Sequence, residues 1–198
     1  METFSAIANR RSIRKFSQKD IPAELIEKIL ACGMQAPSAK NRQPWKFIVV
    51  TNKEKPAMLC AMLAGIDHEE KKAGLLPNSS AFAASARYTA QAMEQAPITV
   101  FVFNTEKNAL WNEAAVEQKF FDIANIQSIG ASIQNMILAA TDLGIGSLWI
   151  CDVFFAYREI CKWLGEENQM IAAISFGYPE EKPGPRPRKR YENVVQWR

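Results

Sequence analysis

The sequence predicts an α+β fold in which a sheet of about four strands is flanked by long helices. Stretches with apolar residues at spacings of three and four, which are typical of helices, alternate with short apolar runs that are typical of strands. The chain of 198 residues is 48% hydrophobic and 23% charged, a composition typical of a globular domain. No internal repeat and no Gly/Ser-rich linker divides it, so we expect one domain.

The expected helices follow from hydrophobic spacing and from the residues at their ends. The clearest covers residues 126–140, where apolar side chains recur every three or four positions before Gly144 ends the pattern. Another begins at Pro22, because proline has no amide to lose in the first turn, and it stops before Pro37. The remaining helices are expected at residues 3–9, 55–63, 81–95 and 155–164.

The expected strands are short, and they cover residues 45–50, 97–103, 146–150 and 170–176. The run at 97–103 (PITVFVF) is apolar at almost every position, which predicts a strand covered on both faces. After Gly177 several prolines exclude a helix, so residues 178–198 should form an extended tail. Its apolar residues Val194, Val195 and Trp197 predict that the tail packs on another surface, such as a second subunit.

Several classes of protein are excluded by composition. No apolar run reaches the roughly 18 residues of a membrane span, and the chain turns basic at Arg10 without the apolar core of a signal peptide. We therefore expect a soluble cytoplasmic protein with no membrane partner. A serine hydrolase is not expected, because there is no G-x-S-x-G motif. No metal site is expected either, since His68 is the only histidine and lies in a polar run that indicates a solvated loop or helix face.

The cysteines are predicted to be small buried thiols. They form no C-x-x-C pair and lie in apolar segments, which indicates a reducing compartment rather than disulfides. Their positions are Cys32, Cys60, Cys151 and Cys161.

Positive charge is concentrated at the two ends of the chain. Residues 10–19 contain five basic residues and no acid, and residues 182–198 contain six basic residues and one acid. Each segment therefore has a charge of +5, although the whole chain has only +3. Three interpretations are open: the two segments bind one anion together, they bind nucleic acid weakly, or they are simply solvated. Composition does not rank these three readings.

Four motifs contain the candidate functional residues: RRSIRKF at 10–16, APSAKNRQPWKF at 36–47, QNMILAATDLGIGSLWI at 134–150, and RPRKRYENVV at 186–195. Arginine and serine supply donors for phosphate oxygens, and the polar second motif can bind the edge of a planar heterocycle. Gly144 and Gly146 permit close approach of a ligand, or they end a helix. In the first motif, Ile13 and Phe16 should anchor the loop while Ser12 and Arg14 point the other way.

Together and in this order, the motifs resemble the nitroreductase family of FMN-dependent oxidoreductases over nearly the whole chain. The resemblance implies that Arg10 and Ser12 hold the phosphate end of FMN, with Arg186 and Arg188 on the same phosphate. Arg14 would reach the N1/O2 side of the flavin ring. The full set of implied cofactor-binding residues is Arg10, Arg11, Ser12, Arg14, Pro37, Ser38, Ala39, Asn41, Gln43, Gly144, Gly146, Trp149, Ile150, Arg186 and Arg188.

The resemblance also implies a nitroreductase-like fold with a central, mainly antiparallel sheet. The whole chain, residues 1–198, would be one FMN-binding domain, with a variable lid or substrate region at about 65–125. Two subunits would form a homodimer with FMN sites at the interface. Residues 37–43 would reach the flavin of the partner, and the tail at 178–198 would be exchanged onto it.

The implied activity is that of an FMN-dependent NAD(P)H oxidoreductase. NADH or NADPH would give hydride to flavin N5 and leave, and a small electron-poor acceptor such as a nitroaromatic, quinone or enone would then be reduced. No residue of the chain would be catalytic, with Arg14 tuning the flavin. Reductive dehalogenation or flavin fragmentation on the same fold remain alternatives, as do a non-catalytic flavin-binding protein and a nucleic-acid-binding protein.

A few aromatic residues have specific expectations. Trp45, Trp149 and Trp163 lie in apolar segments and are expected in the core, and Phe4 and Ile7 should form a buried stripe with Ala8. Trp111, Phe120 and Phe121 are candidates to border the substrate.

Overall fold

One antiparallel sheet forms the centre of the molecule. The computed structural model describes residues 2–106 and 115–198, and its strands are ordered β1-β2-β4-β3. These strands are β1 (Trp45–Thr51), β2 (Ile98–Asn104), β3 (Gly146–Ile150) and β4 (Gln169–Gly177). Strand β2 pairs with both β1 and β4, and every residue in it is buried. The doubly covered strand predicted from the apolar run is therefore confirmed.

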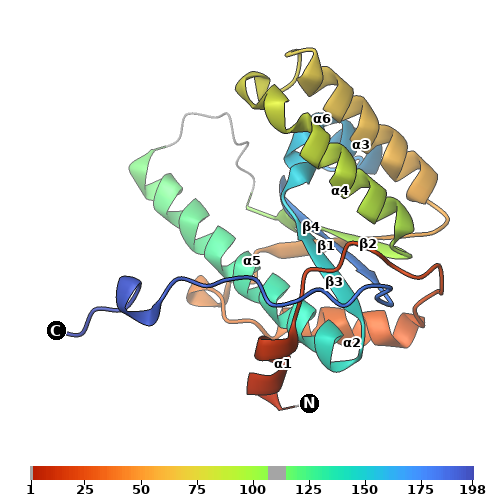
Figure 1. Ribbon diagram of the computed structural model, residues 1–198. Coiled ribbons are helices and arrows are strands. Elements are labelled where there is room, and N and C mark those ends of the chain that lie inside the picture. Colours follow the sequence, from red (N-terminus) through yellow and green to blue (C-terminus); the bar gives the residue numbers. More distant parts are fainter. Residues whose placement is uncertain (1, 107–114) are drawn as a thin grey trace.

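Helices cover both faces of the sheet, as Figure 1 shows. On one face lie α3 (Lys55–Glu70), α4 (Ala83–Gln95) and α6 (Tyr157–Leu164). On the other lie α2 (Ala23–Met34) and α5 (Val116–Asp142), with α1 (Thr3–Asn9) packed on α5. Because side chains alternate along a strand, Phe101 and Phe103 of β2 pack with the first group of helices, and Val100 and Val102 pack with the second. The predicted α+β class and antiparallel sheet are confirmed.

Helix α3 is longer than the sequence predicts. It continues from the expected end at residue 63 to Glu70, through the polar run that contains His68. The carboxylate of Glu69, only 2% exposed, accepts the backbone amides of Leu75 and Leu76 at 2.5 and 2.8 Å. This contact fixes the turn after the helix. Residues 65–70 are thus helical.

Helix α5 also differs from the expectation, because it begins at Val116, ten residues before the predicted start. Its first turns expose apolar side chains, including Val116, Phe120 and Ile123. These three side chains recur at spacings of four and three, so they share one face of the helix, and that face is exposed in the single chain.

Several packing predictions are wrong for the single chain. Phe4 and Ile7 are 88% and 52% exposed, and Ala6 is the buried residue of α1. Trp149 is 40% exposed on β3, whereas Trp45 is buried as expected and Trp163 packs edge-on against Phe101.

The cysteine prediction is corrected as well. Cys32, Cys60 and Cys151 are exposed and Cys161 is half-buried, and all four thiols are free. Three of them therefore lie on the polar side of otherwise apolar segments. Burial raises the pKa of the Cys161 thiol to about 11.

The loop after α1 and the start of the tail run beside each other at the β3 edge of the sheet (Figure 1). Ser12 forms a parallel bridge with Ser147, and the amide of Ile13 donates to the Ser147 carbonyl at 2.9 Å. Further on, Phe16 bridges Pro179 in the antiparallel sense. The loop after α1 and the start of the tail are thus held beside each other. None of the described helices is long and apolar enough to cross a membrane.

Candidate functional site

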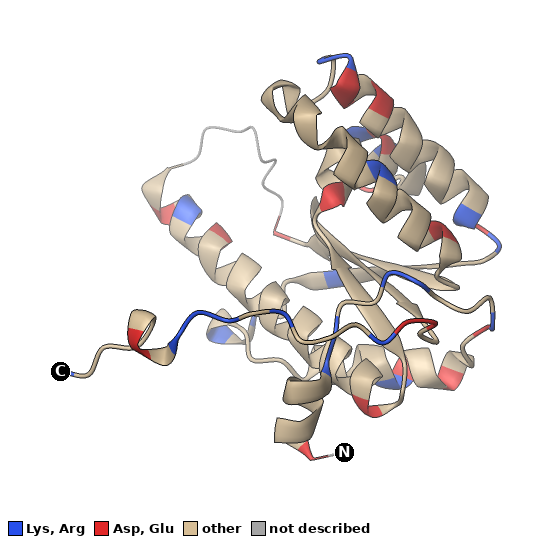
Figure 2. Cartoon of the chain, viewed as in Figure 1, with Lys and Arg blue, Asp and Glu red and all other residues tan. Residues whose placement is uncertain are grey.

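The two basic ends of the chain meet at one cavity of about 430 Å³. Figure 2 shows the tail crossing the loop after α1 where both segments carry Lys and Arg. Six of the predicted site residues line this cavity, namely Arg10, Arg11, Ser12, Arg14, Arg186 and Arg188. Of the three readings of the charge pattern, the geometry therefore favours a shared anion site.

Local packing explains how the first motif presents its polar side chains. Ile13 and Phe16 are 6% and 2% exposed and belong to the core, while Ser12 and Arg14 line the cavity. This alternation confirms the predicted orientation of the loop. Pairing with β3 fixes the backbone, so the polar residues have little freedom to turn away.

Glu181 holds the other side of this loop. Its carboxylate accepts the backbone amides of Arg14 and Lys15, and the amide of Glu180 donates to the Lys15 carbonyl at 2.9 Å. The tail then continues past the loop through Pro183 to Arg188. Glu181 was not among the predicted site residues, although the acidic pair in the tail (PEEKPG) marks it as unusual in a basic segment.

The charge around the cavity is strongly one-sided. Five arginines line it, and no Asp or Glu is among the described lining residues. One guanidinium nitrogen of Arg11 donates to the carbonyls of Ala8 and Arg10, at 2.7 and 2.8 Å, and so caps the end of α1. Arg188 likewise donates to the carbonyls of Arg186 and Pro187. Guanidinium groups gathered in a cavity with no carboxylate among its described lining residues repel each other, so an anion with several oxygens is stabilised here.

The glycine motif lies at an adjoining cavity of about 200 Å³, which shares Arg11 and Pro183 with the first. Gly144 has φ of +73° directly after α5, and the amide of Ile145 donates to Ala140 at 2.8 Å, as in a helix C-cap. A Cβ at Gly146 would meet Ile13 at 2.9 Å. The helix C-cap and the close contact with Ile13 thus explain why glycine occupies both positions, without a ligand.

The remaining residues of that motif are placed differently. Ile150 is 2% exposed and belongs to the core. Trp149 lies on the opposite face of β3 from Ile150, near α5. A Cβ at Gly130 of α5 would be 3.9 Å from its ring. Neither lines the arginine cavity.

The second motif is not brought to the cavity within one chain. Pro37, Ser38, Ala39, Asn41 and Gln43 are absent from its lining. The loop instead meets α5 at Ser128, whose hydroxyl accepts the Ala39 amide at 3.3 Å. Helix α1 lies beside the cavity and packs near Ala139 of α5. Ala139 is about 16 Å along the helix axis from Ser128, where the loop is attached.

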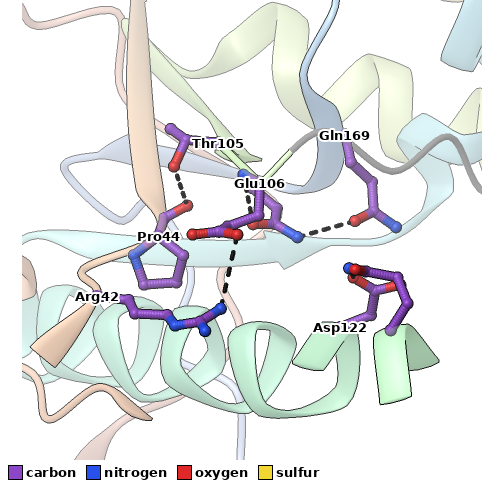
Figure 3. A network of polar contacts seen from close by, with 8 residues as sticks. Arg42, Pro44, Thr105, Glu106, Asp122 and Gln169 are labelled. Carbon is purple, nitrogen blue, oxygen red and sulfur yellow. Dashed lines mark hydrogen bonds and ion pairs between the residues drawn. The ribbon is translucent and has the colours of Figure 1, made fainter. Parts of the chain in front are cut away.

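A polar network that sequence reasoning missed lies beside this loop (Figure 3). Arg42 forms an ion pair with Glu106 at 3.6 Å and lies 4.6 Å from the centre of the Phe121 ring. Phe120 and Phe121 are both exposed on α5. The third aromatic candidate, Trp111, lies outside the described residues. Nothing in the sequence joins residues 42, 106 and 121 before the fold is known.

No group of three or more His, Cys, Asp or Glu side chains that could hold a metal occurs in residues 2–106 and 115–198. His68 pairs instead with Glu159 at 2.7 Å on the exposed face of α3.

Comparison with known proteins gives consistent relatives. The model of the nitroreductase family matches residues 7–178. A protein of Methanothermobacter thermautotrophicus named "Putative NADH dehydrogenase/NAD(P)H nitroreductase" is 31% identical over 195 residues, covering 94% of this chain and 82% of the relative. An "NADPH-flavin oxidoreductase" of Vibrio harveyi is 26% identical, covering 98% of this chain and 72% of the relative. Among solved structures, a BluB-like flavoprotein of Clostridium difficile 630 has a TM-score of 0.80 and 26% identity, with 100% and 99% of the two chains covered.

The family match spans most of the chain, and the structure has the α+β arrangement of these neighbours. This chain belongs to the nitroreductase family.

Proposed function

We propose that this protein is an FMN-dependent NAD(P)H oxidoreductase that reduces small electron-poor acceptors. The observation that carries the proposal is the cavity lined by five arginines from both ends of the chain, with no carboxylate among its described lining residues. Such a donor set fits the phosphate of FMN, which is a dianion near neutral pH. The flavin and NAD(P)H in the names of the relatives support the same choice.

Each residue has a distinct proposed role. Arg10, Ser12, Arg186 and Arg188 bind the phosphate, and Arg14 extends toward the N1/O2 side of the ring. Bound FMN would supply the redox chemistry, which is hydride transfer from NADH or NADPH to a nitroaromatic, quinone or enone in a ping-pong cycle, with the accompanying proton drawn from water. The fixed charge of Arg14 stabilises the negative charge that reduction places near N1 and O2. No protein residue acts as nucleophile or general acid.

A second subunit completes the site in this proposal. The loop at residues 37–43 is remote from the arginine cavity of its own chain, so it serves the flavin of the partner. The tail supports this arrangement, because Tyr191, Val194 and Trp197 are 56%, 61% and 83% exposed and can be buried on a partner. The domain is the whole chain, residues 1–198, and exposed free thiols fit a reducing cytoplasm.

The test begins with the purified protein. We expect yellow protein that releases FMN on denaturation and that bleaches anaerobically with NADH or NADPH. Adding nitroaromatic, quinone and enone acceptors one at a time should restore the colour. Arg10→Ala combined with Arg186→Ala should lose most bound FMN, while Arg158→Ala, an exposed arginine on α6, should keep it.

Other outcomes distinguish the alternatives. A colourless protein that fails to take up FMN and binds DNA or RNA in a salt-dependent manner would replace this proposal with nucleic-acid binding. Yellow protein that does not bleach would indicate a non-catalytic flavin protein. Loss of the flavin ring during aerobic turnover would indicate flavin-fragmenting chemistry.

A further inference from the structure

The loop after α2 has a strained backbone. Lys40, Asn41 and Gln43 have φ of 54°, 53° and 50°, in the left-handed region that residues with a Cβ rarely adopt. Arg42 between them is right-handed, with φ of −69°. Such conformations persist where surrounding contacts enforce them, and they are concentrated at ligand-binding segments.

Contacts inside the loop account for part of this conformation. The hydroxyl of Ser38 accepts the amide of Gln43 at 3.0 Å, and the Gln43 side-chain amide donates to Asn41 at 3.2 Å. All of these residues move together if the loop changes shape. Internal bonds alone therefore do not hold the loop against the rest of the molecule.

Arg42 provides an attachment to two other elements. Its guanidinium pairs with Glu106 just after β2 (Figure 3). The same group lies over the ring of Phe121 on α5, 4.6 Å from the ring centre. Arginine suits this position because its planar group can stack on a ring while its nitrogens face a carboxylate. Lys40 adds a weaker contact, with its nitrogen 5.7 Å from the same ring.

The backbone at Glu106 is held by the end of the sheet. The amide of Glu106 donates to Asn104 at 3.1 Å, and buried Asn104 donates to buried Gln169 on β4 at 3.1 Å. The next residue, Thr105, donates its amide to the Pro44 carbonyl at 2.9 Å, directly after the loop. The loop is thus attached through Arg42 to the rigid end of the sheet.

We infer that Arg42 is a positioning residue, which holds residues 38–43 in the left-handed conformation by bridging Glu106 and Phe121. Under the proposed function this loop lies along the flavin of the partner subunit, and the functional part of the inference rests on that assignment. A loop held in its binding conformation in advance loses less freedom when the ligand binds. Arg42 therefore raises the affinity for FMN without contacting it.

The first experiment needs no flavin. Amide hydrogen exchange of the flavin-free protein should be about tenfold faster at residues 39–43 in Arg42→Met than in the wild type, the size expected for one ion pair and one cation–π contact together. Glu106→Gln should give part of this effect and Arg42→Lys less than Arg42→Met. Lys46→Met removes another cation–carboxylate pair, that with Glu166, and should leave the loop unchanged.

The second experiment measures function in the same variants. Arg42→Met should weaken FMN binding about tenfold, by fluorescence titration, and Arg42→Lys should recover part of it. The reduction potential of bound flavin should stay unchanged, because Arg42 does not contact the ring. Unchanged exchange at residues 39–43 in Arg42→Met would overturn the inference, as would FMN affinity equal to wild type despite faster exchange. If exchange is faster in Arg42→Met but the wild-type protein does not bind FMN, the positioning role of Arg42 is retained and the proposed function is rejected instead.

Discussion

At the scale of single residues, Arg14 is the side chain with the most specific proposed role. It lines the arginine cavity, and its backbone amide donates to Glu181, while the preceding residues Ser12 and Ile13 pair with Ser147 of β3. A guanidinium fixed in this way can stabilise charge at one position of a ligand, rather than offering general attraction.

We predict that Arg14→Ala lowers the two-electron potential of bound FMN by about 30 to 60 mV, which corresponds to losing one hydrogen bond to a charged group. The mutation removes a positive charge that favours the reduced flavin. Redox titration against a reference dye measures the shift, with Arg158→Ala as a control for loss of charge elsewhere. An Arg14→Ala protein with the wild-type potential would show that Arg14 is not near the ring.

Some residues of the site could be predicted from sequence and others could not. Arg10, Ser12 and Arg14 form a local basic motif, and local density is visible in a sequence. Glu181 acts on Arg14 from 167 positions away, and Arg42 meets Glu106 and Phe121 only after β2 and α5 are packed. Such contacts depend on the tertiary fold, so no local sequence pattern predicts them.

At the scale of elements, the strands were predictable and several helix ends were not. Strand β2 is buried throughout and apolar at five of its seven positions because both of its faces are covered, and a sequence displays such a run directly. The last turns of α3 are polar, and their path depends on the buried carboxylate of Glu69, which resembles any solvated acid in sequence. The first turns of α5 do carry apolar residues at helical spacing, Val116, Phe120 and Ile123, and the sequence prediction started this helix ten residues too late.

Close packing of α3 leads to a prediction about stability. A Cβ at Gly65 would lie 2.3 Å from the Ala156 backbone, so Gly65→Ala must push α3 away from its neighbour. We expect a loss of about 1 to 3 kcal/mol, measured by thermal or urea unfolding. Gly130→Ala on α5 is the matched control, because its nearest neighbour would be 3.9 Å away, and it should be neutral or stabilising by up to about 1 kcal/mol. Equal stability of the two variants would contradict the packing at Gly65.

At the scale of the whole molecule, the separation between the arginine cavity and loop 37–43 is the main argument for a shared site. If each FMN site takes its arginines from one subunit and its loop from the other, two differently damaged subunits can complement each other. We predict that subunit exchange between Arg10→Ala/Arg186→Ala and Ser38→Ala/Asn41→Ala in an equal mixture makes about a quarter of all sites intact. Half of the dimers are then mixed, and one of the two sites in each mixed dimer has both of its parts undamaged. FMN content and NAD(P)H-dependent reduction measure the recovery.

The controls for this mixture are the two variants exchanged with themselves, which should stay inactive. If both parts of the site belonged to one chain, every site in the mixture would remain damaged and no recovery would occur. Sedimentation of the mixture would verify that dimers form.

The meeting of the two chain ends beside β3 has a consequence for truncation. The loop with Arg10 and Arg14 precedes every strand along the chain, whereas Arg186 and Arg188 follow the last one. Removing the residues after Pro183 therefore leaves all four strands but only three of the five arginines around the cavity, so we expect the shortened chain to fold its sheet and to bind anions more weakly.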